Sequence, residues 1–412
     1  MESKSRYNYI VLLIVVFGGF LIFGFSENIK GPAIPRMQTD FGLGESRLGM
    51  LLALNSLGYL VACTFTSVLA RRIGIKLTGI LALVSMAISG VLIYLSVTYP
   101  MLTASYFLLY IGNGMLEIGL AIMAARIFTK NTGTMMNLAH FFYGLSSIAA
   151  PVLAASMMGW SFGGGGELDW RGMYLIMLAL SLLPVLPALI GRFPGERQQE
   201  AGAHSPLRGV MRDPVSWLIV AILSFGVVSE LAVGSWLVYY LEKAYAWTSG
   251  DASRMLSLFF VCFTLSRLVL GPITDRIGYT MSILIFSAFS GLCNLAAIAI
   301  GEPGAFLFAL SGAGIAPIYP TVMAMLSKRY PHQVDIAITF TVTLMGVACV
   351  IGNYLIGGII EWVRVLFGGR GAEGSGLLGL QAGYGFIAVL ALLCSATCIV
   401  LYVYLNRRKQ LL

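Results

Sequence analysis

The chain has 412 residues, of which 58% are hydrophobic and only 11% are charged, and its mean hydropathy is +0.86. A soluble globular protein carries roughly 25% charged residues, so a single water-soluble core is excluded. The net charge of +8 does not indicate nucleic-acid binding, because the basic residues fall in short loops between apolar runs.

About twelve apolar runs are long enough to cross a bilayer, which takes about 20 residues each. Backbone polar groups have no water to bind in lipid, so the runs are expected to be helices. They cover residues 9–29, 47–70, 77–98, 100–125, 134–158, 172–192, 215–242, 252–274, 279–300, 304–326, 335–362 and 380–405. The predicted fold is an all-α integral membrane protein with twelve transmembrane helices.

Lys and Arg residues set the expected orientation of these helices. With the N-terminus inside, the inner loops carry about twice as many basic residues as the outer ones. The sequence therefore predicts a multi-pass protein of the cell (cytoplasmic) membrane with both termini cytoplasmic.

The first run ends in a carboxylate, Glu27, followed by Lys30. One interpretation is a local ion pair three residues apart near the outer end of the helix. The other is a polar site, since Gly31 and Pro32 are expected to break the helix and open its backbone toward a cavity. A carboxylate inside a membrane segment costs several kcal/mol, so it usually faces a cavity, a partner or a proton path.

The loop after the second run reads Ser67-Val-Leu-Ala-Arg71-Arg72-Ile-Gly74, and a matching loop after the eighth run reads Gly271-Pro-Ile-Thr-Asp275-Arg276-Ile-Gly278. Tight turns favour Gly, and an Asp at a helix end can hold a neighbouring helix. For the first copy, the alternative is that its basic residues only anchor the loop inside the cell. Candidate gating residues are Arg72, Gly74, Gly271, Asp275, Arg276 and Gly278.

The fourth and fifth runs carry further polar residues. Glu117 lies midway along the fourth run, with Asn113 one turn earlier on the same face. Glu117 is a candidate proton carrier or, alternatively, a protonated structural residue bonded to a neighbouring helix. The fifth run carries Asn137, His140 and Tyr143, and His140 could equally be an ordinary interior residue.

A polar stretch from Gly191 to Asp213 divides the chain. The predicted domains are an N-terminal six-helix bundle (1–193), a cytoplasmic linker (194–213) and a C-terminal six-helix bundle (214–412).

The C-terminal half repeats the pattern of polar residues in apolar runs. Glu230 lies midway along the seventh run, and Arg267, deep in the eighth, is a possible ion-pair partner of Glu230 or of Asp275. Trp236 and Tyr239 follow Glu230, and either line a solute site or belong to an interfacial aromatic belt. Tyr319 and Asn353 complete the candidate substrate-binding residues.

The Gly-x-x-x-Asp-Arg-x-Gly loop resembles the signature of the major facilitator superfamily, although Ser67 and Arg71 depart from it in the first copy. Several segments are similar to one branch, comprising the fucose–proton symporters, bacterial glucose permeases and sodium-dependent glucose transporters. These are Gly112-Asn113-Gly114 to Glu117, Asn137 to Gly144, Ser229-Glu230 to Leu241, and Gly314 to Pro320.

The resemblance implies two pseudo-symmetric six-helix bundles and a secondary active transporter working by alternating access, not an enzyme. We expect a small polar solute, most of all a sugar, because amides, carboxylates and aromatic faces suit hydroxyl-rich molecules. The predicted substrate-binding residues are Glu27, Asn113, Asn137, His140, Tyr143, Glu230, Trp236, Tyr239, Tyr319 and Asn353, with Glu117 and Glu230 in proton coupling.

Two alternatives stay open: an exporter of a drug or metal-chelating metabolite by proton antiport, and a non-transporting membrane sensor. No cofactor or metal is expected. The coupling ion would be a proton, with sodium as an alternative. The expected partners are a small-molecule substrate and the lipid bilayer, without nucleic acid, and the expected state is a monomer.

Overall fold

The computed structural model describes residues 2–127, 132–162, 166–193, 207–330, 334–368 and 372–408. In these ranges the regular structure is helical, apart from β1 (Ser161–Phe162), which pairs antiparallel with β2 (Gly166–Glu167). Among the described residues, eleven helical stretches are long and apolar enough to cross a membrane. A further helix, α11 (Ser249–Ile277), covers the predicted eighth run. The predicted all-α membrane fold is confirmed.

The chain divides into two compact units. Unit 1 consists of Met1–Gly42 and Leu54–Gln199, and unit 2 consists of Leu43–Ala53 and Glu200–Leu412. The start of α3 (Glu45–Ile73) therefore belongs to the second unit, although it lies in the N-terminal half of the sequence. Of the predicted linker, residues 194–206 lie outside the described ranges, and α9 (Leu207–Arg212) follows them.

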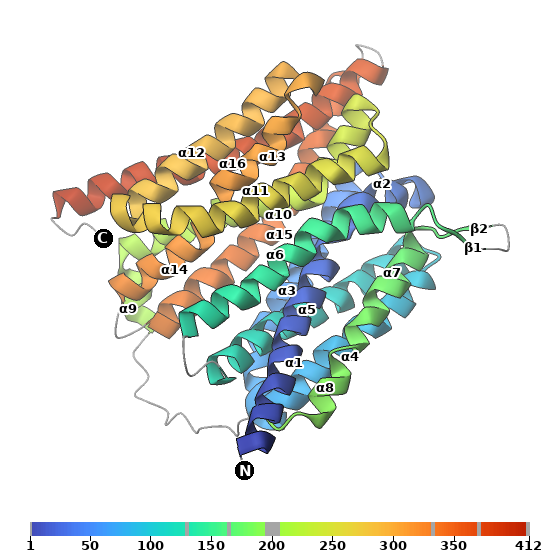
Figure 1. Ribbon diagram of the computed structural model, residues 1–412. Coiled ribbons are helices and arrows are strands. Elements are labelled where there is room, and N and C mark those ends of the chain that lie inside the picture. Colours follow the sequence, from blue (N-terminus) through green and yellow to red (C-terminus); the bar gives the residue numbers. More distant parts are fainter. Residues whose placement is uncertain are drawn as a thin grey trace. The chain divides into compact units, whose positions relative to one another are not determined.

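In unit 1, the long helix α1 packs against α5 and α6, and α4 packs against α5 and α7 (Figure 1). The helices of this unit, besides the rest of α3, are α1 (Glu2–Asn28), α2 (Lys30–Phe41), α4 (Ile75–Tyr94), α5 (Tyr99–Ile127), α6 (Thr132–Met157), α7 (Trp170–Ala179), η1 (Leu180–Leu182) and α8 (Val185–Ile190).

In unit 2, α10 packs against α15 and α16, and α12 packs against α13 and α16. Besides α9 and α11, its helices are α10 (Pro214–Tyr245), α12 (Tyr279–Ile300), η2 (Glu302–Gly304), α13 (Phe306–Ile315), α14 (Ile318–Arg329), α15 (Val334–Leu366) and α16 (Ala372–Arg407).

Two packing relations recur in both units. The first spanning helix of each half packs on the fifth, as α1 on α6 and α10 on α15. The third packs on the fourth and on the sixth, as α4 on α5 and α7, and α12 on α13 and α16. This repeated packing is what two pseudo-symmetric six-helix bundles require.

The two matching loops have the same backbone geometry. Gly74, between α3 and α4, has φ 85° and ψ 151°, and Gly278, between α11 and α12, has φ 86° and ψ 151°. Side chains with a Cβ rarely occupy this region, whereas Gly does so freely. The half-repeat read from the sequence is therefore present as a shared turn.

Helix breaks differ in two places from the expectation. The interruption near Glu27 is confined to Ile29, and α2 continues to Phe41 because Pro32 lies in its first turn, where a missing N–H is tolerated. The expected break near Gly31 and Pro32 is thus present as an interruption at Ile29, and the chain resumes a helix at Lys30. Conversely, the run 304–326 is not continuous, because it is broken between Ile315 and Ile318.

Candidate functional site

The break between α1 and α2 holds a buried ion pair. Lys30 contacts Glu27 through its ammonium group and also donates a hydrogen bond of 3.0 Å to the hydroxyl of Tyr110 on α5. The exposed fractions of Glu27 and Lys30 are only 9% and 6%. The local pair, one of the two interpretations of Glu27, is therefore present, but it lies inside the unit and not in water.

Glu117 on α5 has a hydrogen-bond partner that the sequence did not indicate. The hydroxyl of Tyr59 on α3 donates to one oxygen of this carboxylate. Glu117 is half-buried, and among the described residues it forms no ion pair with a basic side chain. The structure thus leaves a carboxylate in a membrane helix without a counter-charge in contact.

Asn113 lies one turn before Glu117 and is fully buried. Its carbonyl oxygen accepts a hydrogen bond of 2.8 Å from Ser26 on α1, whereas its amide nitrogen has no partner in the described part of the chain. Asn55, one turn before Tyr59, is also buried, and neither of its amide atoms is paired there. Unpaired buried amides are costly, so they indicate a place for water or a ligand.

Close packing of α3 on α5 makes the Tyr59–Glu117 contact possible. A Cβ atom added at Gly114 would lie 2.8 Å from the Cβ of Ala62 and 3.0 Å from the carbonyl oxygen of Tyr59. Small residues allow membrane helices to approach at this distance. The close approach of the two helices thus explains why a glycine occupies position 114, in a segment that resembles the sugar-transporter branch.

The fifth spanning helix, α6, places its candidates differently. His140 is exposed, and its ring centre lies 5.1 Å from that of Phe20 on α1. Tyr143 is half-buried and lies 5.3 Å from Phe23, measured between ring centres. The side chain of Asn137 lies outside the described residues, so its predicted role stays a prediction.

Glu230 on α10 is half-buried, and Arg267 on α11 is the described basic residue whose charge acts on it. The two do not form an ion pair within 4.0 Å. Instead, Arg267 donates from Nε to the carbonyl oxygen of Ala316, at 3.1 Å, and lies 4.2 Å from the ring centre of Phe263. The expected direct ion pair is replaced by a longer-range electrostatic interaction.

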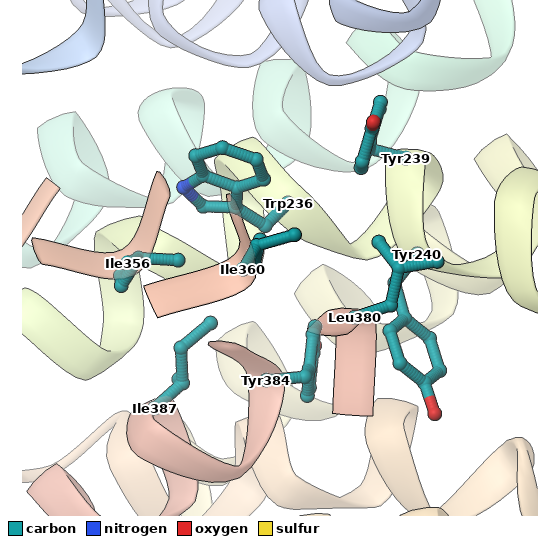
Figure 2. A pocket seen from close by; sticks show the side chains of 8 residues that line it. All are labelled: Trp236, Tyr239, Tyr240, Ile356, Ile360, Leu380, Tyr384 and Ile387. Carbon is teal, nitrogen blue, oxygen red and sulfur yellow. The ribbon is translucent and has the colours of Figure 1, made fainter. Parts of the chain in front are cut away.

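Trp236 and Tyr239 lie in the interior of unit 2. Figure 2 shows them among the side chains that line a small cavity. Its volume is about 10 Å³, which suits roughly one water molecule. The cavity is lined by aromatic and branched apolar side chains: Trp236, Tyr239, Tyr240, Ile356, Ile360, Leu380, Tyr384 and Ile387. The indole N–H of Trp236 has no partner among the described residues. This cavity is too small and too apolar to hold a sugar.

Tyr239 belongs to a polar cluster that sequence reasoning missed. Its hydroxyl donates to Glu45, at 2.8 Å, and Glu45 also contacts Arg364 of α15. The next backbone N–H, that of Ser46, donates to Glu361, at 3.0 Å. All these residues belong to unit 2. No local sequence signal links Glu45 to Arg364, because the two are far apart in the chain.

The remaining candidates are placed as follows. Tyr319, at the start of α14, is half-buried, and Asn353, in α15, is 7% exposed. Arg72 and Arg276 lie in the last turns of α3 and α11 and are exposed. Gly271 and Asp275 lie on α11, but their side chains are outside the described residues. The gating assignments therefore stay predictions.

Within each unit, these groups can bind a hydroxyl or hold a proton. In the described part of the chain, the amide nitrogen of Asn113 has no acceptor, and the carboxylates of Glu117 and Glu230 form no ion pair. Among the described residues, no cluster of three or more His, Cys, Asp or Glu side chains could hold a metal ion.

The chain matches the family model of the Major Facilitator Superfamily over residues 16–241 and 230–411. It is 21% identical to the L-fucose-proton symporter of Escherichia coli (strain K12) over 377 residues, which is 84% of this chain and 86% of that protein.

Solved structures show the same fold. One is a bacterial homologue of the human lysosomal transporter Spinster, in an inward-facing and unoccupied conformation, with TM-score 0.78 and 14% identity over 97% of this chain and 98% of that one. Another is a D-xylose-proton symporter, with TM-score 0.75 and 15% identity over 94% and 97%. The repeated six-helix units, the shared glycine turns and the family match together show that this chain belongs to the Major Facilitator Superfamily, whose members are transporters and not enzymes.

Proposed function

We propose that the chain is a secondary transporter that moves a small polar solute, most of all a sugar, across the cytoplasmic membrane by alternating access, driven by the proton gradient. Both termini would be cytoplasmic and the working unit a monomer.

Glu117 is the observation that carries this proposal. It is half-buried in a membrane helix, its one described hydrogen-bond donor is the neutral hydroxyl of Tyr59, and no basic side chain of the described part neutralises it. A charged carboxylate in this position is costly, whereas its protonated form is not. A group with that property can bind a proton on one side of the membrane and release it on the other.

A sugar fits the neighbouring groups. Asn113 offers an unpaired amide N–H one turn from Glu117, and a hydroxyl of a sugar can accept from the amide while donating to a carboxylate. The relatives named for fucose and xylose transport support a sugar and a proton as the transported pair. Sodium is the second candidate ion, because carboxylate and amide oxygens also bind hard cations.

The test is uptake by purified protein in liposomes with an imposed pH gradient, using labelled neutral hexoses and pentoses. The wild type should accumulate at least one of them above equilibrium. Glu117→Gln should abolish this accumulation while leaving exchange of solute across the membrane in place, because exchange needs no net proton movement. The matched control is Glu302→Gln, an exposed glutamate on η2.

Uphill uptake that persists in Glu117→Gln would show that another group carries the proton. Accumulation that depends on a sodium gradient and not on pH would show that the coupling ion is sodium and not the proton. Efflux of hydrophobic dyes with no sugar uptake would favour the exporter.

A further inference from the structure

The fourth spanning helix of unit 2 is broken at two prolines. An α-helical N–H bonds the carbonyl four residues earlier, so Pro317 leaves the carbonyl of Ala313 without its donor, and Pro320 does the same to Ala316. The break separates α13 from α14. Free carbonyls inside a membrane segment need other donors.

Two adjacent residues of α11 supply those donors. The hydroxyl of Ser266 donates to the carbonyl of Ala313, at 2.6 Å, and Nε of Arg267 donates to the carbonyl of Ala316, at 3.1 Å. The ring of Phe263, one turn earlier, lies under the guanidinium at 4.2 Å. The Arg267 side chain is therefore held in one orientation by a hydrogen bond at Nε and an aromatic face.

This orientation uses only one of the five N–H donors of the guanidinium. Arg267 is half-buried, and no hydrogen bond or ion pair of its two terminal nitrogens occurs within the described ranges. A hydroxyl or amide would cap a single carbonyl without placing a charge in the membrane. The cap therefore does not explain why the residue is an arginine.

We propose that the terminal nitrogens of Arg267 bind the carboxylate of a sugar acid, so that this transporter takes an acidic sugar in preference to a neutral one. This inference rests on the proposed transport of a sugar and names its class. The two parallel N–H groups of a guanidinium match the two oxygens of a carboxylate, and a side chain already fixed at Nε loses little freedom on binding.

The protonation of Glu230 affects whether a carboxylate can bind at Arg267. The carboxyl group of Glu230 lies within electrostatic reach of Arg267. A bound carboxylate cancels the charge of Arg267 and faces a second anion, unless Glu230 holds a proton. The anion of an acidic sugar and a proton would therefore enter together, and these two transported species carry no net charge between them.

The test compares two sugars that differ at one carbon. Glucuronate carries a carboxylate where glucose carries a hydroxymethyl group. Binding to the purified full-length chain at mildly acidic pH, measured by calorimetry and by the shift in melting temperature, should favour glucuronate over glucose in the wild type by roughly tenfold or more. Arg267→Gln should reduce the preference to about one while leaving the affinity for glucose unchanged.

Arg254→Gln is the matched control, since it removes an exposed arginine from the same helix. Arg267→Lys keeps the charge without the paired donors and should give an intermediate preference. If Arg267→Gln does not fold, the preference for glucuronate over glucose is compared between the wild type and Arg267→Lys, and this comparison still tests the role of the guanidinium.

Glucose binding without any preference for glucuronate would overturn this inference and leave the proposed sugar transport standing. A preference that survives intact in Arg267→Gln would also overturn it. If neither sugars nor sugar acids bind or are taken up, the proposed function fails and this inference fails with it.

Discussion

At the scale of single residues, the three membrane carboxylates fall into two kinds. Glu27 is enclosed and paired with Lys30, whereas Glu117 and Glu230 are half-buried and form no ion pair in the described part of the structure. Protonation does little to stabilise a carboxylate that is enclosed and already paired, whereas it strongly stabilises a buried carboxylate without an ion-pair partner. The sequence suggested Lys30 as a partner for Glu27 and Arg267 for Glu230, and only the fold decides which of these pairs forms.

The two glycine turns allow a direct test of backbone strain. A Cβ added at Gly74 would have no atom within 4 Å, so an alanine there would be strained by its φ of 85° alone, and Gly278 has nearly the same φ, 86°. Gly74→Ala and Gly278→Ala should each destabilise the protein by about 1–3 kcal/mol, measured by thermal unfolding in detergent.

Gly119→Ala is the control for this pair, because Gly119 lies inside α5 and no atom lies within 4 Å of its added Cβ. That change should be neutral or slightly stabilising, since alanine favours a helix. Equal stability of the Gly74 variant and the wild type would contradict the strain argument.

At the scale of elements, the first turn of α3 is held to α10 and α15 by buried charge. Glu45 is 6% exposed as a side chain and contacts Arg364, which is 38% exposed, while Tyr239 donates to its other oxygen. Removing the arginine leaves a buried carboxylate short of a partner. Water reaching Arg364 weakens the pair, so its loss is milder than for a fully buried one.

We expect Arg364→Met to lower the unfolding free energy by about 1–3 kcal/mol. Adding Glu45→Gln should recover part of that loss, because it removes the unpaired charge. Thermal unfolding of both single variants and the double variant gives the coupling. Strictly additive losses would show that the two side chains do not interact in the folded protein.

A second charged side chain, Asp213, links helices at the start of α10, outside the membrane-spanning segments. Asp213 caps the helix by accepting from the backbone N–H of Val215, and also accepts from Tyr330, at 2.8 Å, and from Arg329, at 3.1 Å. Partial burial by itself would raise the pKa of Asp213, but these hydrogen bonds outweigh it and lower the pKa below its ordinary value. The cap therefore joins α10 to the end of α14.

The sign of the pH effect follows from that lowered pKa. A carboxylate with a lower pKa in the folded state contributes stability above its unfolded pKa, about 4, and loses it as the pH falls through the folded value. The difference in melting temperature between the wild type and Asp213→Asn should be full at pH 7 and shrink below about pH 4. A difference that does not change between pH 7 and pH 3 would contradict this account.

At the scale of the whole molecule, the shared turns at Gly74 and Gly278 place the two predicted gating loops at equivalent points of the two units. Arg276 is exposed and lies in the last turn of α11, two or more turns from Arg267 along the same helix. Residues in such a loop act on the balance of states if their contacts form in only one of them.

Asp275→Asn should therefore change the labelling of single cysteines placed near the ends of α11 and α14, and leave the ranking of substrates unchanged. A population shifts only by the free energy that differs between states. The control is Asp251→Asn, an exposed residue at the other end of α11. A variant that alters substrate ranking with an unchanged labelling pattern would place Asp275 in the solute site instead.

The sequence by itself determined the membrane class, the helical runs, the half-repeat and the list of polar residues inside them. These properties depend on local composition and spacing, which hydropathy and turn chemistry record directly. Tertiary structure decided what each polar residue contacts: Tyr59 on Glu117, Lys30 and Tyr110 beside Glu27, the Glu45–Arg364 pair, and the carbonyls capped by Ser266 and Arg267. Apart from the Glu27–Lys30 pair, these contacts join residues far apart in the chain, so no local pattern encodes them. Whether a buried charge is stable, reactive or structural depends on such partners, because its free energy is set by the groups that surround it.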